Sequence, residues 1–262
     1  MLADELIALY DAAREAPPFT QTHPGLTPAA GYAAALALHR HRLGLGWKPL
    51  GRKIGFTNRT IWPRYGVYEP IWGTVYDRTA AFAQHDPAAI PLDGQLTPRT
   101  EPEICFRLKS VPRGPGTDAL LEAIDWVAHS IEIVQSRFPD WKFKLADCTA
   151  ANGLHGRLLV GTPHPVRDLP RLAEALPAVA LELLKEGKVI DRGVGANVLD
   201  SPLLALGHFV EALARQPGAE PLAAGEIIST GTLTDAHPVR PGESWSTRLS
   251  GLPIAGLSVR FE

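Results

Sequence analysis

Strict alternation between Glu101 and Leu108 is the feature of this chain that most constrains its fold. In Glu-Pro-Glu-Ile-Cys-Phe-Arg-Leu, proline or an apolar residue occupies every second position, and both glutamates fall on the alternate positions. Because successive side chains of a β-strand point to opposite faces, this pattern predicts a strand that is buried on one face. Glu101 and Glu103 are then expected to share the other face.

Helix and strand signals mingle along the rest of the chain. Thr27-Pro28 before an Ala- and Leu-rich run is typical of a helix start, and Glu186-Gly187 is typical of a hairpin turn. The 24 Gly and 24 Pro residues are many for a helical bundle and favour turns and short strands. We predict helices over residues 3–15, 28–43, 117–128 and 202–215, and strands over 130–134, 179–184, 188–191, 226–230 and 254–261. Without a regular β-α-β rhythm, this order favours an α+β fold over a doubly wound sheet.

Length and charge limit the classes of protein to consider. A chain of 262 residues allows one large domain or two small ones, and a change in composition places a soft boundary near Tyr76. The net charge of −2 supplies no general field for nucleic acid or an anionic membrane, so we expect neither as a partner.

Cysteine usage and the first residues point to a cytoplasmic protein. Cys105 and Cys148 are far apart and lack the spacing of zinc or redox sites, which fits a reducing compartment. The sequence begins Met-Leu-Ala-Asp-Glu-Leu, which is acidic where a signal peptide would be basic. No apolar run approaches the roughly 18 residues that a membrane-spanning helix needs.

Three glutamates form the first candidate site. A two-residue step along a strand puts the carboxylates of Glu101 and Glu103 roughly 7 Å apart on one face. Glu132 lies in Ser-Ile-Glu-Ile-Val, where apolar neighbours predict a buried strand. A buried carboxylate must be neutralised, and Mg²⁺ or Mn²⁺ would neutralise all three together. The alternative for the Glu101–Glu103 pair is a solvated strand face.

Two lysines and an aspartate form the second candidate group. Lys53 and Lys142 both have aromatic or apolar neighbours that could tune an amine, so either could meet an anionic substrate or move a proton. The alternative is that each is a surface lysine whose stem lies along apolar groups. Asp77 follows an expected strand and is a candidate acid or base, although such residues more often cap turns.

These residues belong to an ordered set of motifs that resembles the fumarylacetoacetate hydrolase superfamily, and within it the 2-keto-4-pentenoate hydratase and 4-oxalocrotonate decarboxylase group. The set covers nearly the whole chain. It comprises Gly51-Arg-Lys-Ile-Gly-Phe-Thr57, Gly73-Thr-Val-Tyr-Asp77, Glu101-Pro-Glu-Ile-Cys-Phe106, the Glu132 strand, Asp140-Trp-Lys142, Ala146-Asp147, Asn152, Gly231-Thr-Leu-Thr and Pro238-Val-Arg-Pro-Gly242.

The resemblance implies a rolled, mostly β catalytic core over residues 77–262 and a helical N-terminal portion over residues 1–76 that contributes Lys53. It also implies a homo-oligomer, for which the aromatic-rich segment 62–76 could supply interface anchors. The implied ligands of Mg²⁺ or Mn²⁺ are Glu101, Glu103 and Glu132. The implied catalytic residues are Lys53, Asp77 and Lys142, and Asn152, His155 and Thr232 are expected to bind substrate.

One position departs from the group's pattern. Hydratases of the group usually carry a serine shortly after an Asp-Asn pair, but this chain reads Ala-Asn-Gly-Leu-His-Gly from Ala151 to Gly156. His155 stands where the small hydroxyl is expected. It could act as an acid or base, bind a second substrate carboxylate, or be a packed histidine with a backbone partner. The segment from Thr232 to His237 offers a further Asp and His with the same alternatives.

We therefore expect a lyase that hydrates a 2-hydroxy-2,4-dienoate to a 4-hydroxy-2-oxo acid, as in aromatic catabolism. The expected ligand is a small 2-oxo or 2-hydroxy-enol acid. Decarboxylation of a 2-oxo-dicarboxylate is the second hypothesis, and C–C hydrolysis of an acylpyruvate is the third. A protein that binds the metal and a keto acid without catalysis is the rival from another class.

Overall fold

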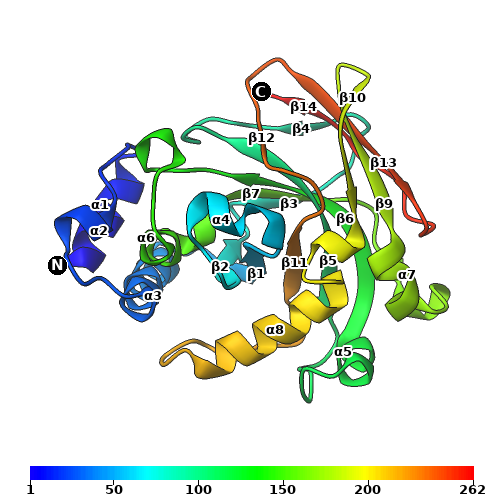
Figure 1. Ribbon diagram of the computed structural model, residues 1–262, viewed down its shortest axis with the longest axis horizontal. Coiled ribbons are helices and arrows are strands. Elements are labelled where there is room, and N and C mark those ends of the chain that lie inside the picture. The colour runs from blue at the N-terminus through cyan, green and yellow to red at the C-terminus, as the bar shows by residue number, and fades with distance from the viewer.

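The computed structural model describes residues 1–262 and contains a large curled β-sheet, a smaller sheet and surrounding helices (Figure 1). Seven strands of the large sheet follow the order β2-β1-β11-β5-β6-β7-β3, while β12 pairs with β5 and β8 pairs with β6. These strands are β1 (Pro49–Gly55), β2 (Ile71–Tyr76), β3 (Ala80–Phe82), β5 (Arg99–Leu108), β6 (Ile124–Val134), β7 (His155–Val160), β8 (His164–Pro165), β11 (Ile227–Thr232) and β12 (His237–Pro238).

The smaller sheet packs against the large one over a shared core. Its strand order is β10-β9-β13-β14-β4. The strands are β4 (Ala88–Ile90), β9 (Ala180–Lys185), β10 (Lys188–Val194), β13 (Ser244–Ser250) and β14 (Ser258–Phe261). Ile104 of β5, Leu183 of β9 and Trp245 of β13 belong to one buried apolar cluster, so the two sheets form a single hydrophobic core.

Helices cover the sheets on two sides. In Figure 1, α8 runs beneath the strands, and α1, α2, α3 and α6 gather near the N-terminus. The α-helices are α1 (Leu2–Asp11), α2 (Phe19–Thr22), α3 (Pro28–Gly44), α4 (Trp62–Tyr65), α5 (Thr117–Ala123), α6 (Leu145–Ala150), α7 (Leu172–Ala178) and α8 (Pro202–Arg215). The 3₁₀ turns are η1 (Arg59–Ile61), η2 (Pro139–Trp141), η3 (Asn152–Leu154), η4 (Val166–Asp168) and η5 (Gly195–Asn197). None of these helices combines the length and apolarity needed to cross a membrane.

The predicted α+β class and rolled sheet are confirmed, and so are the 28–43 helix, the 202–215 helix and the hairpin of β9 and β10. The predicted helix over 117–128 is wrong beyond Ala123, because Ile124 begins β6 and pairs with Leu108. Strand pairing with β5 therefore overrides the helical pattern. The prediction that β5 is buried on one face is also wrong, since Glu103 and Cys105 on its polar face are buried as well.

The predicted helical portion over 1–76 contains strands in its last third. Both β1 and β2 lie in the large sheet, where β1 pairs in parallel with β11 near the end of the chain. The helices of this portion lie in its first 44 residues, apart from the single turns η1 and α4. Of the aromatic residues expected at an interface, Trp72 and Tyr76 are buried within the chain itself, whereas Tyr68 is exposed.

Candidate active site

Strand register brings the three predicted carboxylates together. Glu101 of β5 lies directly opposite Glu132 of β6, and Glu103 is two residues further along β5. Ligand oxygens of the three side chains lie within 4.8 Å of one another. Like charges directly opposite each other destabilise a strand pair, so this register requires a neutralising partner.

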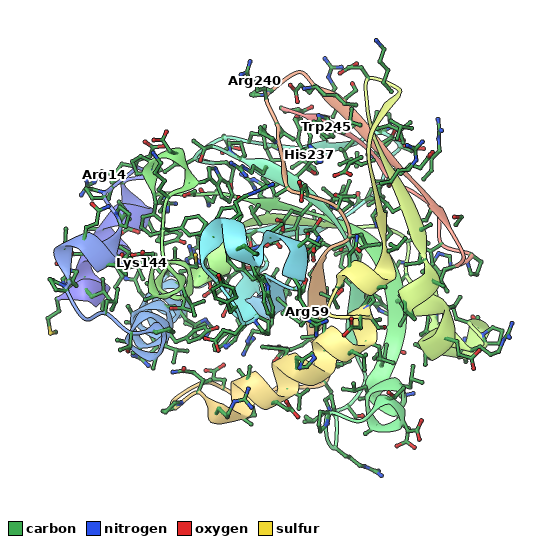
Figure 2. The ribbon with its side chains drawn as sticks, viewed as in Figure 1. Arg14, Arg59, Lys144, His237, Arg240 and Trp245 are labelled. Atoms are coloured by element: carbon green, nitrogen blue, oxygen red, sulfur yellow. The ribbon has the colours of Figure 1, made fainter.

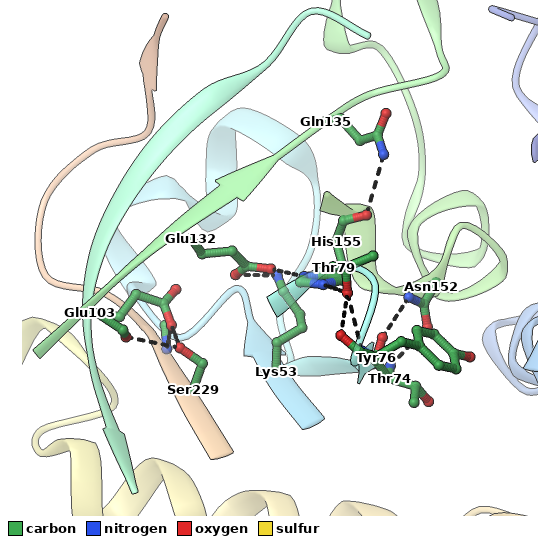
Figure 3. Close-up of polar contacts among 12 residues, drawn as sticks. Lys53, Thr74, Tyr76, Thr79, Glu103, Glu132, Gln135, Asn152, His155 and Ser229 are labelled. Carbon is green, nitrogen blue, oxygen red and sulfur yellow. Dashed lines mark hydrogen bonds and ion pairs between the residues drawn. The ribbon is translucent and has the colours of Figure 1, made fainter. Parts of the chain in front are cut away.

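Lys53 is the one cationic side chain that pairs with these carboxylates. It lies on β1, is 2% exposed, and its Nζ is 3.1 Å from Glu132 Oε2 (Figure 3). Burial alone would lower the pKa of Lys53, but the Glu132, Glu101 and Glu103 carboxylates raise it above its ordinary value. Lys53 is therefore an ammonium that compensates one of three negative charges.

The two remaining carboxyls lack full compensation. Burial raises the pKa of Glu101 to about 7, against the lowering effect of Lys53. Burial, followed by the charges of Glu132 and Glu101, raises the pKa of Glu103 well above its usual range. By contrast, Lys53 and His155 outweigh burial and hold the pKa of Glu132 below its ordinary value.

One carboxylate oxygen of Glu103 accepts hydrogen bonds, and the other accepts none. Its Oε2 accepts hydrogen bonds from the Ser229 hydroxyl and, at 3.0 Å, from the Gly231 backbone N–H, both on β11. Its buried Oε1 has no hydrogen-bond partner. Gly231 has φ of +104°, and an added Cβ would lie 1.8 Å from Thr57 Oγ1, so this close approach requires glycine.

A divalent cation fits this arrangement. Three convergent carboxylates with an orphaned buried oxygen match the oxygen ligands that hard cations prefer. The cation would supply the positive charge that Lys53 alone does not. The residues present therefore fit the metal that the sequence predicts.

His155 lies behind the carboxylates. Its Nδ1 is 2.8 Å from Glu132 Oε1, and its Nε2 is 2.9 Å from Thr79 Oγ1 (Figure 3). Burial, only partly offset by Glu132, lowers the pKa of His155, so the ring is neutral. Because Glu132 is ionised and can only accept, Nδ1 carries the proton and Nε2 accepts from Thr79. His155 is thus a packed histidine, the third of its alternatives, but its ring is held by two side chains and not by the backbone.

The structure does not bring Asp77 and Lys142 to the carboxylates. Lys53 lies opposite Gly73 of β2, and Asp77 follows the last residue of that strand, four residues or about 13 Å from Gly73. There it is exposed and accepts a hydrogen bond from the Lys48 backbone N–H. Lys142 is 80% exposed and pairs with Asp140 at 3.2 Å. Asp77 therefore caps a turn, and Lys142 lies at the outer surface.

Asn152 and Thr232 are buried near the site, but their polar groups serve the backbone. The Asn152 amide accepts from Thr74 N–H at 2.8 Å and donates to Thr74 C=O at 3.0 Å. The Thr232 hydroxyl donates to Thr234 C=O and accepts from Thr234 N–H. Of the other candidates in this loop, His237 pairs with Asp191 at 2.7 Å and lies toward the smaller sheet (Figure 2).

A pocket leads from the surface to Glu101 and Lys53. Its walls include aromatic and aliphatic side chains and two arginines that the sequence analysis did not single out, Arg64 and Arg99. Arg99 donates a hydrogen bond to the Tyr65 hydroxyl at 3.1 Å and stacks on Trp141. Arg99 shares the alternation of Glu101 and Glu103 on β5, which is the signal that could have found it.

Comparisons with known proteins identify relatives of this chain. No model of a protein family matches the chain. It is 34% identical over 253 residues to a 2-hydroxyhexa-2,4-dienoate hydratase of Comamonas testosteroni, covering 93% of this chain and 92% of the hydratase. It is 30% identical to a 4-oxalocrotonate decarboxylase of Pseudomonas sp. strain CF600, covering 98% of this chain and 97% of that protein.

Solved structures show the same likeness. A 4-oxalocrotonate decarboxylase from Pseudomonas putida G7, complexed with magnesium and adipate, superposes with a TM-score of 0.89 at 28% identity. The match covers 100% of this chain and 96% of the decarboxylase. A fumarylacetoacetate isomerase/hydrolase homologue from Oleispira antarctica, at 20% identity and a TM-score of 0.59 over 81% of this chain and 94% of that one, shares the fold.

Proposed function

Because the chain belongs to the 2-keto-4-pentenoate hydratase and 4-oxalocrotonate decarboxylase branch of the fumarylacetoacetate hydrolase superfamily, we propose that it hydrates a 2-hydroxy-2,4-dienoate to a 4-hydroxy-2-oxo acid. The observation that carries this proposal is the convergence of Glu101, Glu103 and Glu132 beside Lys53 at the end of a pocket.

We assign the metal to these three carboxylates. Mg²⁺ and Mn²⁺ both favour sites made of carboxylate and water oxygens, and Glu101, Glu103 and Glu132 offer no softer ligand. When bound, such a cation stabilises negative charge that develops on the 2-oxygen of a 2-oxo acid.

The pocket suits a small anion with an apolar tail. Lys53, Arg64 and Arg99 supply positive charge, whereas Glu101 and Asp235 are the acidic residues of the lining. Apolar side chains complete the wall, namely Phe56, Ile61, Val134, Phe143 and Leu154. A dienoate combines a carboxylate with an apolar carbon chain, so it matches both halves of this surface.

Lys53 is the proton-transfer residue of the proposal. As an ammonium it can donate a proton to C5 of the dienol, and the amine left behind can take up the proton that the 2-hydroxyl loses as it becomes the ketone. The product is a conjugated enone, and water then adds across its C3–C4 double bond, with the hydroxyl on C4 and the proton on C3. Glu132 holds the lysine head in place, which fixes the direction of its proton.

Decarboxylation of a 2-oxo-dicarboxylate is the second candidate, and the two arginines favour it. Arg64 and Arg99 lie on the pocket wall and could bind a second carboxylate of the substrate. The related decarboxylase structure holds adipate, which is a dicarboxylate.

Two further proposals concern the setting of the enzyme. We propose a homo-oligomer, with the exposed Tyr68 as an interface residue, and light scattering at micromolar concentration should give a multiple of the 28.3 kDa chain mass. We also propose a cytoplasmic location, because Cys105 and Cys148 are both unpaired thiols.

Isosteric substitution of the carboxylates tests the proposed function. Glu101→Gln, Glu103→Gln and Glu132→Gln keep side-chain shape and remove charge, so each should raise the Mg²⁺ concentration needed for turnover. Glu182→Gln, at a partly exposed position on β9 of the smaller sheet, is the matched control and should leave the Mg²⁺ requirement unchanged. Full activity after exhaustive chelation would refute the metal assignment, whereas metal and keto-acid binding without turnover of any candidate substrate would favour a binding protein.

A further inference from the structure

A second cavity lies on the far side of His155 from Glu132. Both His155 and Thr79 line it, and its other walls come from α1, α3 and the segments around Trp47 and Arg137. Its volume is about 160 Å³. A cavity of this size can hold a benzene-sized molecule.

Two buried arginines dominate the charge of this cavity. Arg42 is 8% exposed and Arg137 is 4% exposed. The Arg42 guanidinium lies 4.8 Å from the centre of the Tyr10 ring, and the Arg137 guanidinium lies 4.0 Å from it. The two cations are therefore no more than roughly 9 Å apart and repel each other.

Neither guanidinium is neutralised by an acid. The acidic residue of the lining is Asp11, which is exposed at the rim and lies 3.6 Å from His41. Arg137 donates one hydrogen bond to the Leu9 carbonyl, while its Nε is buried without a partner. Arg42, in the last turn of α3, lies over the rings of Tyr10, Trp47 and Tyr76, which attract a cation but carry no negative charge. Arginine stays charged in proteins, so these two buried charges call for an anion.

We propose that this cavity binds a small planar organic carboxylate. A carboxylate presents two oxygens that match the fork of a guanidinium, and the pair of arginines against one rim acid suits a single negative charge. Apolar side chains of the lining, among them Leu38, Leu45 and Trp47, suit an aromatic or unsaturated body. The bound acid would lie against the side of His155 opposite the metal carboxylates.

Calorimetric titration of the Mg²⁺-loaded enzyme with benzoate tests this site. Arg42→Gln and Arg137→Gln should each weaken benzoate binding at least about tenfold, because each removes a charged hydrogen-bond donor. Arg78→Gln is the matched control, since Arg78 is an exposed neighbour of Trp47, and it should leave affinity within about twofold. Arg137→Lys keeps the charge and should give an intermediate loss even if the glutamine variant folds poorly.

Two results would overturn the proposal. One is a benzoate affinity that does not depend on Arg42 or Arg137, whether or not the binding of inorganic phosphate depends on them. The other comes from crystals of the unchanged protein soaked in 4-bromobenzoate, where the bromine signal is expected beside Tyr10 and Arg137. A bromine signal confined to the Glu101 pocket, where Arg99 offers a competing site, would exclude the second cavity.

Discussion

Lys53 Nζ lies 3.1 Å from Glu132 Oε2 in the middle of the large sheet, and both side chains are almost completely buried. Lys53 comes from β1 and Glu132 from β6, and the strands β11 and β5 lie between them in the sheet. The two side chains therefore reach across the curl of the sheet toward the same point. This relationship ties the proposed proton donor to the proposed metal site.

Replacing Lys53 with methionine tests its role as a proton donor. Lys53→Met keeps the length and apolar stem but removes the ammonium, so we expect turnover to fall by about 10² to 10⁴ while Mg²⁺ still binds. Lys142→Met removes an exposed lysine and should stay near full activity. Circular dichroism and steady-state rates provide the measurement, and an unfolded Lys53→Met protein would make the lysine structural.

His155 is expected to act by positioning Glu132. His155→Leu removes the donor to Glu132 Oε1 and should weaken Mg²⁺ binding by about 10- to 100-fold, as for other residues that orient a metal ligand. His155→Asn can keep a donor near the position of Nδ1 and should recover most of the affinity. If the leucine variant and the unchanged protein bind Mg²⁺ with equal affinity, His155 does not position Glu132 for the metal.

The pKa of Glu101 predicts a pH-dependent metal affinity. Because burial raises this pKa to about 7, the metal-free carboxyl carries a proton below that pH, and a cation must displace it. Mg²⁺ affinity should therefore fall as pH drops from 8 to 6, with proton release on binding. Titration calorimetry in buffers of different ionisation enthalpy measures that release; binding that releases no proton at pH 6 would contradict the prediction.

His129 predicts a loss of stability in acid. Its two ring nitrogens are used by the Glu103 carbonyl and the Thr247 hydroxyl, and burial lowers its pKa to about 4. The unfolded state, with an ordinary histidine pKa, binds the extra proton first, so stability falls as pH drops from about 6.5 toward 4. At pH 5 the loss is about 2 kcal/mol from this residue.

Urea unfolding at pH 7 and pH 5 measures the His129 effect. His129→Gln removes the titrating ring, so the variant should be less stable at pH 7 but should lose less stability between the two pH values. His164→Gln, on the short strand β8, is a control in which the pH dependence should persist. An identical pH dependence in His129→Gln would assign the acid sensitivity to other groups.

The sequence predicts the centre of the site better than its surroundings. Alternation in β5 and the apolar neighbours of Glu132 are local signals that indicate a shared carboxylate site, and the family resemblance favours this site over a solvated strand face. The position of Asp77 depends on the register of β2 against β1. This register puts Gly73 opposite Lys53, so Asp77 lies four residues beyond that pair and far from the carboxylates. A sequence motif shows that Lys53 and Asp77 are both present, but it does not show whether strand pairing brings them to the same end of β1 and β2.

Long-range contacts explain the other differences. Asn152 is committed to the Thr74 backbone, 78 positions away, and His155 to Glu132 across the β6–β7 pair. Neither partner is adjacent in sequence, so periodicity and composition cannot predict these contacts. The same holds for Arg42 and Arg137, which meet only because α3 and the segment after β6 both pack against Tyr10.

Product analysis tests the proposed hydration most directly. The Mg²⁺-loaded enzyme is given 2-hydroxyhexa-2,4-dienoate and, separately, a 2-oxo-dicarboxylate of the 4-oxalocrotonate type, while dienol absorbance, CO₂ release and product mass are followed. We predict that the dienoate gains the mass of one water without losing carbon, and that Lys53→Met abolishes this gain. Release of CO₂ from the dicarboxylate, with no action on the dienoate, would contradict hydration and establish decarboxylation in its place.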